Sequence, residues 1–306
     1  MHRWRGVPRR LQVVPARTAP LVRDHDRTRD GARLADIRTA ADYNRRSGPK
    51  PMPECVRAEG LSPAMTAIGR RAVRLEHLLT APNASLRDLD EAVALVLEHD
   101  LVGALTVSPW LVKAARRKLG RSHLRLGTII GYGHGGQLLA VKAFEASKAL
   151  EQGATQIDFV MNGGALISGE EETVYNDMLG VVDMAHSALA VAGVIIEAET
   201  LPDELIRKAC RIAERAGVDQ VVTSNGLATA RHAVALTSVL RDCVGPRVQV
   251  KAAGRFKDAE EVSAAFVAGA AHLAAVLTPG LIEGVAATLP VGPQEPAAVG
   301  AAASRR

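Results

Sequence analysis

The stretch Val248-Gln249-Val250-Lys251-Ala252-Ala253-Gly254-Arg255 places one lysine at the end of a short β-branched run and directly before small residues. The run predicts a strand with Lys251 at its carboxyl edge, and the small residues predict a loop whose backbone can approach a ligand. In a barrel of alternating strands and helices, that edge carries the catalytic groups. The alternative is a lysine whose stem packs on the barrel and whose amine is solvated.

Around this stretch, short apolar runs alternate with amphipathic segments. Strands are predicted at 73–79, 103–107, 124–130, 156–161, 192–197, 219–223, 247–251 and 272–277, with a helical pattern after each of the first seven. This alternation favours a closed (β/α)8 TIM barrel over an open doubly wound sheet. A glycine-rich turn at 131–136 follows the third strand and not the first, so it is a weak dinucleotide signal.

Charge and composition divide the chain into three parts. Residues 1–60 contain 14 Lys and Arg against 7 Asp and Glu, whereas the remainder contains 24 against 26. We therefore expect residues 1–65 to be a disordered basic leader, or sequence upstream of a true start at Met52 or Met65, and 66–290 to be the barrel. Residues 291–306, rich in Pro, Ala and Gly, are expected to be a disordered tail. The leader lacks aromatic interleaving, so no nucleic-acid partner is expected.

Several features indicate a cytoplasmic protein without a membrane anchor. No run reaches the roughly 18 apolar residues that a membrane span requires. No apolar segment follows Arg9-Arg10, so a twin-arginine export signal is not expected. The three cysteines, Cys55, Cys210 and Cys243, are odd in number and lack metal-ligand spacing, which is typical of a reducing compartment. We expect neither a metal nor a cofactor.

Asp158 and Lys251 are charged residues on predicted strands that are otherwise mainly apolar. Asp158 lies between Ile157 and Phe159, where an unpaired carboxylate would be costly. It either pairs with Lys251 to satisfy two buried charges, or the two residues form an acid/base and amine pair. Desolvation at a barrel mouth lowers the pKa of a lysine, which favours carbinolamine or Schiff-base formation.

Other polar residues at the predicted strand ends have two interpretations each. Thr223-Ser224-Asn225-Gly226 is either part of a substrate site or a turn with a helix cap. Glu197 either contacts substrate or bonds neighbouring backbone, and His134 is either a base or an ordinary loop histidine. Glu76 on the first predicted strand is a further carboxylate.

Four motifs, at 153–162, 194–197, 223–226 and 250–254, together resemble the DeoC family of class I deoxyribose-phosphate aldolases. The resemblance covers about residues 72–280 in register. It implies a TIM barrel that adds acetaldehyde reversibly to glyceraldehyde 3-phosphate through a lysine Schiff base, with a second lysine and an aspartate moving protons. By position, it implies that Asp158 is the proton-relay aspartate and Lys251 the second lysine, and that barrel helices form a homodimer.

The same resemblance shows departures from the family pattern. The family's Schiff-base lysine corresponds to Val222, which cannot form an imine, and another family lysine corresponds to Gly193. Gly254-Arg255 stands where the family has Gly-Gly, and residues 274–277 are apolar where it has Gly-Thr-Ser-Ser. These changes weaken a phosphate cradle, although Arg255 offers a bidentate anion contact.

Three functions follow from the sequence and remain open. The first is a DeoC-like carbon–carbon lyase of secondary metabolism that acts on a sugar-derived or non-phosphorylated carbonyl compound, with Lys251 as relocated amine nucleophile or acid/base and Asp158 as proton shuttle. The second is a non-catalytic barrel that binds a metabolite or a partner. The third is a true deoxyribose-phosphate aldolase. The expected catalytic residues are Lys251, Asp158 and Glu76, and the expected substrate contacts are Thr223, Ser224, Asn225, Gly226, Gly254, Arg255, Glu197 and His134.

Overall fold

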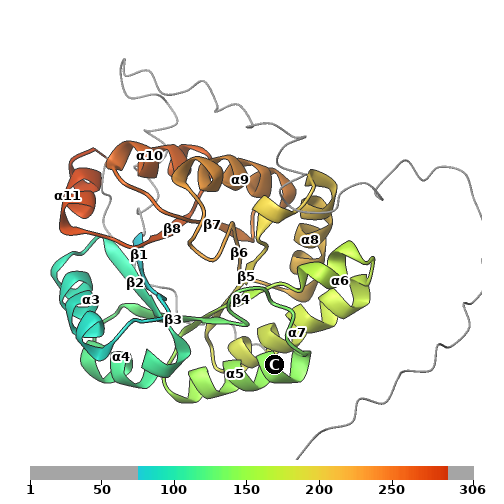
Figure 1. Ribbon diagram of the computed structural model, residues 1–306, viewed down its shortest axis with the longest axis horizontal. Helices are drawn as coiled ribbons and strands as arrows, with labels where there is room; N and C mark the ends of the chain where they lie inside the picture. The colour runs from blue at the N-terminus through green and yellow to red at the C-terminus, as the bar shows by residue number, and fades with distance from the viewer. Residues whose placement is uncertain (1–74, 289–306) are drawn as a thin grey trace, which may run out of the picture. The chain divides into compact units, whose positions relative to one another are not determined.

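The structure, a computed structural model, describes residues 75–288, which form a closed barrel of parallel strands inside a ring of helices (Figure 1). The strands follow chain order: β1 (Leu75–Leu79), β2 (Val102–Val107), β3 (Arg125–Ile130), β4 (Gln156–Val160), β5 (Val191–Ile195), β6 (Gln220–Val222), β7 (Gln249–Ala253) and β8 (His272–Ala275). Pairing of β8 with β1 closes the ring. The predicted TIM barrel is confirmed, and the predicted leader and tail lie outside the described residues.

One long helix follows each strand and covers the outside of the barrel (Figure 1). These helices are α3 (Leu86–Glu98), α4 (Val112–Leu119), α5 (Leu139–Glu151), α7 (Glu171–Ser187), α8 (Asp203–Ala216), α9 (Ala230–Cys243), α10 (Ala259–Val267) and α11 (Pro279–Thr288). Three short elements, η1 (Pro109–Leu111), α6 (Gly163–Ile167) and η2 (Ala198–Thr200), lie in loops after strands. The sequence analysis missed α6 and η2 because one turn is too short to show a helical period.

The start of α3 shows how local sequence sets a helix boundary. The Ser85 side chain accepts the Asp88 amide, and the Asp88 carboxylate accepts the Ser85 amide at 2.7 Å, which completes a capping box. Buried apolar residues then recur at helical spacing and pack against the sheet: Leu89, Ala92, Val93 and Val96.

Alternate residues of each strand point into the barrel and build two layers of opposite character. The layer nearer the carboxyl ends is apolar; we call it the apolar layer, and it consists of Leu78, Ile129, Val160, Ile195, Val222, Ala253 and Ala274. Each of these residues lies two positions beyond a member of a deeper layer, which contains Glu76, Gly127, Asp158, Gly193, Gln220, Lys251 and His272. Because every second side chain of a strand points into the barrel, residues two positions apart form successive layers, and here an apolar layer lies above a polar one.

Several predicted strand ends differ from the structure, and two of these errors affect the site. β7 continues through Ala252 and Ala253, which pair with Leu273 and Ala274 of β8, so Lys251 lies inside the strand and not at its edge. Pairing and burial override the low strand propensity of alanine. Conversely, β5 ends at Ile195, so Glu197 lies beyond the strand.

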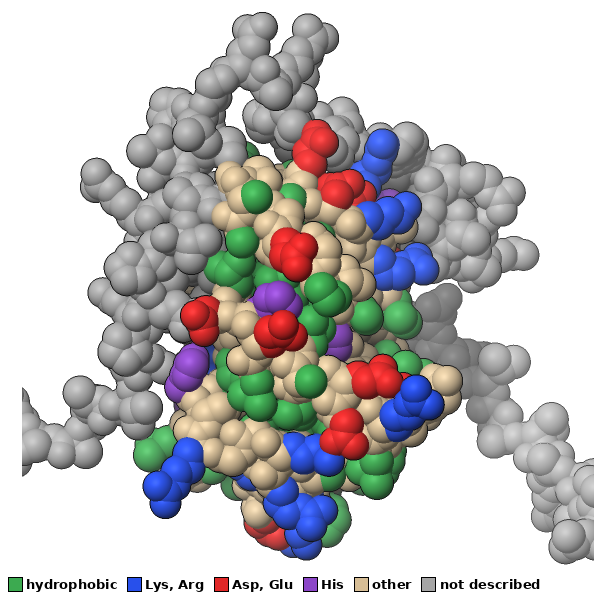
Figure 2. All heavy atoms as spheres, turned by 90° about the vertical axis from the view of Figure 1, so that its left-hand side faces the viewer, with side chains coloured by type: hydrophobic (Ala, Val, Ile, Leu, Met, Phe, Trp, Pro, Cys, Tyr) green, Lys and Arg blue, Asp and Glu red, His purple; other side chains and the backbone are tan. Residues whose placement is uncertain are grey.

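Within residues 75–288, no helix is both long and apolar enough to span a bilayer. Figure 2 shows the face on the side of α3 and α11, where acidic, basic and apolar side chains are interspersed. This face does not present the continuous basic surface that nucleic-acid binding requires.

Candidate active site

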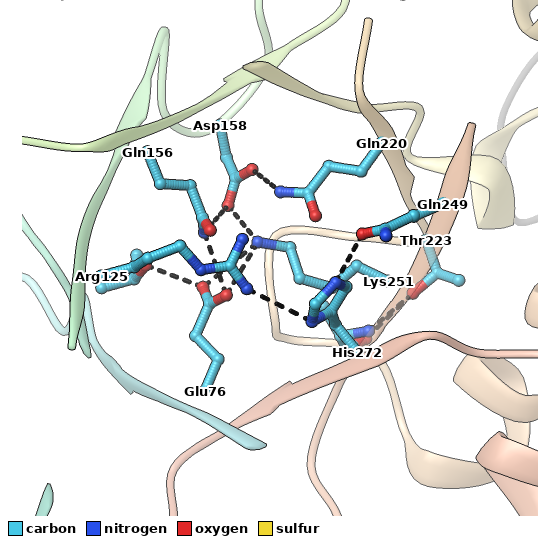
Figure 3. Close-up of polar contacts among 11 residues, drawn as sticks. Glu76, Arg125, Gln156, Asp158, Gln220, Thr223, Gln249, Lys251 and His272 are labelled. Atoms are coloured by element: carbon cyan, nitrogen blue, oxygen red, sulfur yellow. Dashed lines mark hydrogen bonds and ion pairs between the residues drawn. The ribbon is translucent and has the colours of Figure 1, made fainter. Parts of the chain in front are cut away.

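Lys251 lies at the centre of a buried charged cluster inside the barrel (Figure 3). Its Nζ donates to Asp158 Oδ2 at 2.5 Å and to the two carboxylate oxygens of Glu76 at 3.0 and 3.2 Å. All three residues are at most 3% exposed. Lys251 and Asp158 therefore form the contact that both interpretations of the sequence require, and Glu76 adds a second carboxylate.

Neutral side chains also donate hydrogen bonds to the carboxylate oxygens of Asp158 and Glu76. Gln220 Nε2 donates to Asp158 Oδ1 at 3.0 Å, and Gln156 Nε2 donates to Glu76 Oε2 at 3.0 Å. Thr106 Oγ1 donates to Glu76 Oε1 at 2.7 Å. The sequence analysis missed both glutamines, although Gln156 shares the inward parity of Asp158 and was therefore detectable.

Two strand glycines make room for this cluster. A side chain at Gly127 would collide with the Thr106 hydroxyl, and one at Gly193 would collide with the Asp158 carboxylate and lie 2.8 Å from Gln220 Cγ. The strands of a barrel cannot separate locally to relieve such overlap, so the absence of Cβ atoms is part of the site.

We expect Gly193→Ala to lower the free energy of unfolding by about 1–3 kcal/mol, because the new methyl group overpacks the interior and displaces Asp158. Urea denaturation measures the change. The matched control is Gly103→Ala on β2, where nothing lies within 4 Å of the added atom. Equal stability of the two variants would show that packing around Asp158 does not require the absence of a Cβ atom at position 193.

The charges of the cluster determine its protonation. Burial lowers the pKa of Lys251, but the charges and hydrogen bonds of Asp158 and Glu76 outweigh burial and raise this pKa above its ordinary value. The prediction of a lowered lysine pKa is therefore wrong, because two carboxylates surround the ammonium group. At rest Lys251 is an ammonium ion, and it must lose a proton before it can attack a carbonyl.

The two carboxylates differ in how readily they accept that proton. Burial raises the pKa of Glu76, but Lys251 and the donors Gln156 and Thr106 hold it down at about 2. Burial also raises the pKa of Asp158; Lys251 lowers it, Glu76 raises it, and the result lies above the ordinary value. Asp158 is thus the group to which Lys251 transfers its proton most readily.

Polar contacts close the amino-terminal end of the cluster. Arg125, His272 and Gln249 are the first residues of β3, β8 and β7. His272 Nε2 lies 2.6 Å from Gln249 Oε1, and its Nδ1 lies 3.4 Å from Arg125 Nη2. These residues therefore bound the charged cluster on one side (Figure 3). The apolar layer, nearer the carboxyl ends of the strands, bounds it on the other.

The Thr223-Ser224 hydroxyls, predicted to contact substrate, bond to the protein itself. Thr223 Oγ1 accepts from the Ala253 amide at 2.9 Å and donates to the Ala253 carbonyl oxygen at 3.2 Å. Ser224 Oγ donates to the same carbonyl oxygen at 2.9 Å and accepts from the Gly226 amide at 3.2 Å. These bonds fasten the loop after β6 onto β7, and a substrate contact by either hydroxyl stays a prediction.

The same loop reaches across to β1. Gly226 has φ +94°, and a Cβ atom there would lie 2.6 Å from Leu78 Cδ1 in the apolar layer. Only glycine combines this backbone conformation with so close an approach. The Asn225 amide donates to Glu197 Oε1 at 3.0 Å, which links the loop to the end of β5.

Glu197 adopts a left-handed backbone conformation (φ 49°, ψ 48°) at this end of the barrel. Burial raises its pKa, the Asn225 amide lowers it and the charge of Glu199 raises it, with a result of about 7. Near neutral pH this carboxyl group can both accept and return a proton, which suits acid/base chemistry.

We expect ionisation of Glu197 to destabilise the folded protein as the pH rises. Its pKa increases from 4.5 to about 7 on folding, so stability is highest below 4.5 and is lost as the pH rises to about 7. Between pH 5 and pH 8, the wild type should lose about 2 kcal/mol more unfolding free energy than Glu197→Gln. Urea denaturation at both pH values tests this, with the exposed Glu170→Gln as control; identical losses in all three proteins would contradict the shift.

The remaining predicted residues lie outside the charged cluster. His134 Nδ1 accepts the Gly136 amide at 3.0 Å, and its side chain is exposed. The Gly254 amide donates to the Ala274 carbonyl oxygen at 3.1 Å, whereas the Arg255 side chain is exposed. Among the described residues, neither His134 nor Arg255 makes a polar contact with Lys251, Asp158 or Glu76.

The family model described as "DeoC/LacD family aldolase" matches residues 65–289. The chain belongs to this family. Within the described part of this DeoC/LacD protein, no three His, Cys, Asp or Glu side chains are arranged to hold a metal ion.

Named relatives of this DeoC/LacD chain align with about two thirds of its length. Deoxyribose-phosphate aldolase of Enterococcus faecalis is 35% identical over 210 residues, covering 69% of this chain and 94% of that protein. The Thermococcus gammatolerans enzyme of the same name is 35% identical over 212 residues, again 69% and 94%. The family resemblance is confirmed, whereas the correspondence of Val222 to the family's Schiff-base lysine stays a prediction.

Solved structures agree with this assignment. The structure titled "QR15, an Aldolase" aligns with TM-score 0.63 and 26% identity, covering 69% of this chain and 94% of that one. The deoxyribose phosphate aldolase of Aeropyrum pernix, described as tetrameric, aligns with TM-score 0.63 and 25% identity, covering 76% and 100%.

Proposed function

We propose that this DeoC-family protein is a carbon–carbon lyase that cleaves and forms β-hydroxyaldehydes, with Lys251 as the amine that carries the substrate. One observation supports it above the others: Lys251 is the only lysine in the eight described strands, and two carboxylates contact its Nζ inside the barrel. Covalent aldol chemistry needs an amine beside an acid/base group. The relatives named deoxyribose-phosphate aldolase make 2-deoxyribose 5-phosphate the first substrate to test.

In the first step, Lys251 passes its proton to Asp158 across their 2.5 Å hydrogen bond. The neutral amine adds to the substrate aldehyde carbon, and Asp158 returns the proton to the carbonyl oxygen. Loss of water leaves an iminium ion. Its positive charge replaces that of the ammonium group between Glu76 and Asp158, so the cluster stabilises the intermediate without reorganisation.

In the second step, a base removes the proton of the β-hydroxyl group and the bond between the α and β carbons breaks. The electron pair moves into the iminium group to give an enamine, and the first aldehyde leaves. Protonation of the enamine carbon and addition of the water lost earlier release acetaldehyde and restore Lys251. Glu197 is our candidate for the base, because it lies at the carboxyl end of the barrel with a pKa of about 7.

One observation favours a second candidate, a non-catalytic barrel that binds a metabolite or a partner. Lys251 is 1% exposed, and the apolar layer lies between it and the carboxyl-terminal loops. A substrate can reach Nζ only when this layer and the loop held by Thr223 and Ser224 move aside. A barrel without turnover needs no such motion.

Borohydride trapping separates the two candidates. The full chain is incubated with acetaldehyde, 2-deoxyribose 5-phosphate and a panel of aldehydes and keto acids, then reduced and measured by intact-mass spectrometry. We expect acetaldehyde to add one ethyl group, and peptide mapping to locate it on Lys251. The absence of an adduct with every carbonyl compound would contradict covalent catalysis and favour the binding function.

A further inference from the structure

We infer that the substrate presents an apolar group, and not a phosphate, to the carboxyl-terminal end of the barrel. This inference rests on the proposed function, because it describes the part of the substrate that lies beyond the carbonyl carbon bound to Lys251. Three independent features of that end carry it: the side chains directly above Lys251, the use of the backbone amides, and the charge and hydropathy of the loops.

The side chains directly above Lys251 cannot bond to an anion. Lys251 pairs with Val222 on β6, and two residues beyond it Ala253 pairs with Ala274 on β8. Val222, Ala253 and Ala274 are at most 2% exposed and carry no polar side-chain atom. A carbonyl carbon bonded to Lys251 Nζ lies beneath the apolar layer, to which these three side chains belong, and no side chain of that layer carries a polar atom that could pair with a phosphate.

Backbone amides that would otherwise bind a phosphate are already occupied. After β7, the Gly254 amide donates to Ala274 O at 3.1 Å and the Arg255 amide to Ala228 O at 2.8 Å. After β8, the Leu277 amide donates to His77 Nδ1 at 3.1 Å. Phosphate sites at strand ends depend on free N–H groups, and these three amides are not free.

Helix α10, which follows the loop after β7, also disfavours an anion. The N-cap residue of α10 is Asp258, whose carboxylate accepts the Glu261 amide at 2.9 Å, and the first turn contains Glu260 and Glu261. The amino terminus of α10 is thus acidic, which repels a phosphate. The cations of the preceding loop, Arg255 and Lys257, are exposed and lie outside the apolar layer.

Large apolar side chains are exposed on the loops at the same end of the barrel. Trp110 (59% exposed) follows β2, Tyr132 (36%) follows β3, Leu227 (63%) follows β6 and Val276 (67%) follows β8. Exposed apolar side chains on the carboxyl-terminal loops of a barrel are available to contact a substrate. With the apolar layer below them, they match a substrate with an alkyl or aryl group on the carbon that bears the hydroxyl.

A representative substrate is 3-hydroxy-3-phenylpropanal, which retro-aldol cleavage converts into benzaldehyde and acetaldehyde. We expect its kcat/KM to exceed that of 2-deoxyribose 5-phosphate at least tenfold, with acetaldehyde release measured for both. We also expect unphosphorylated 2-deoxyribose to react at least as well as its phosphate. Preference for the phosphorylated sugar over both other compounds would overturn the inference while leaving the proposed lyase function standing.

A specificity variant tests the apolar layer itself. Ala274→Ser adds one hydroxyl group above Lys251 and is expected to lower kcat/KM for the aryl substrate about tenfold, without loss of the acetaldehyde adduct. The matched control is Ala275→Ser, one residue further along β8 and in the core outside the barrel. Equal effects of the two variants on the aryl substrate would contradict a substrate contact at Ala274.

A binding measurement covers the case in which no carbonyl compound forms an adduct. Titration calorimetry with the full chain compares two unreactive probes, 3-phenylpropan-1-ol and inorganic phosphate. We expect the alcohol to bind and Ala274→Ser to weaken it, while phosphate does not bind. Binding of phosphate without the alcohol would overturn the inference, whereas binding of the alcohol without adducts would uphold it and reject the proposed lyase.

Discussion

Lys251→Met is expected to abolish the borohydride-trapped adduct and to lower aldol cleavage by about three orders of magnitude or more, because the described strands contain no second lysine to replace it. The same change leaves the carboxylates of Glu76 and Asp158 facing each other without a cation. Removing one partner of a buried ion pair typically costs about 3–5 kcal/mol of stability. Adduct formation must therefore be compared at equal concentrations of folded protein, measured by circular dichroism.

Lys142→Met is a closely matched control. Lys142 is also fully buried, and its Nζ donates to Asp177 Oδ2 at 2.7 Å and to the Val160 carbonyl oxygen at 2.9 Å. Loss of the Lys142 amine lowers the stability of the protein by a similar amount, because it also breaks a buried ion pair, but it removes no amine from the barrel interior. We expect this variant to keep the adduct. Loss of the adduct in Lys142→Met, or its retention in Lys251→Met, would refute the assignment of Lys251.

Asp158→Asn is expected to slow imine formation by about 10²–10⁴-fold at neutral pH, because Lys251 loses the neighbour that most readily takes its proton. The remaining carboxylate, Glu76, has a pKa of about 2 and is a poor acceptor. Solvent must then deprotonate Lys251 directly. The trapping rate of the variant should therefore rise steeply with pH, whereas that of the wild type should depend on pH much less.

This pH dependence separates a proton-transfer role from a structural one. An asparagine at position 158 still accepts a hydrogen bond from Gln220, so a variant that is only destabilised would trap slowly at every pH. Asp177→Asn, which alters the buried carboxylate bonded to Lys142, provides the control and should trap at the wild-type rate. A variant of Asp158 with unchanged trapping at neutral pH would contradict the proton relay.

Most of the barrel was predictable because its signals are local. Short apolar runs, a Ser85 cap and amphipathic helices occur within windows of about ten residues. The prediction erred where pairing between distant strands decides the outcome, as at β7, whose last two alanines become strand residues only because β8 lies beside them. Gln156 and Gln220 were missed for the same reason, since their role depends on carboxylates from other strands.

The sequence by itself determined the order of strands and helices, the family, and the presence of Lys251 and Asp158 at inward positions, because period and motif are properties of neighbouring residues. Only the tertiary structure determined the protonation state and the burial of those residues. Closing the barrel brings Lys251 against carboxylates 93 and 175 residues away and places an apolar layer above them. The protonation of a buried amine depends on such distances, so the lysine that was expected at a strand edge, with its pKa lowered by desolvation, is a charged residue buried within the strand.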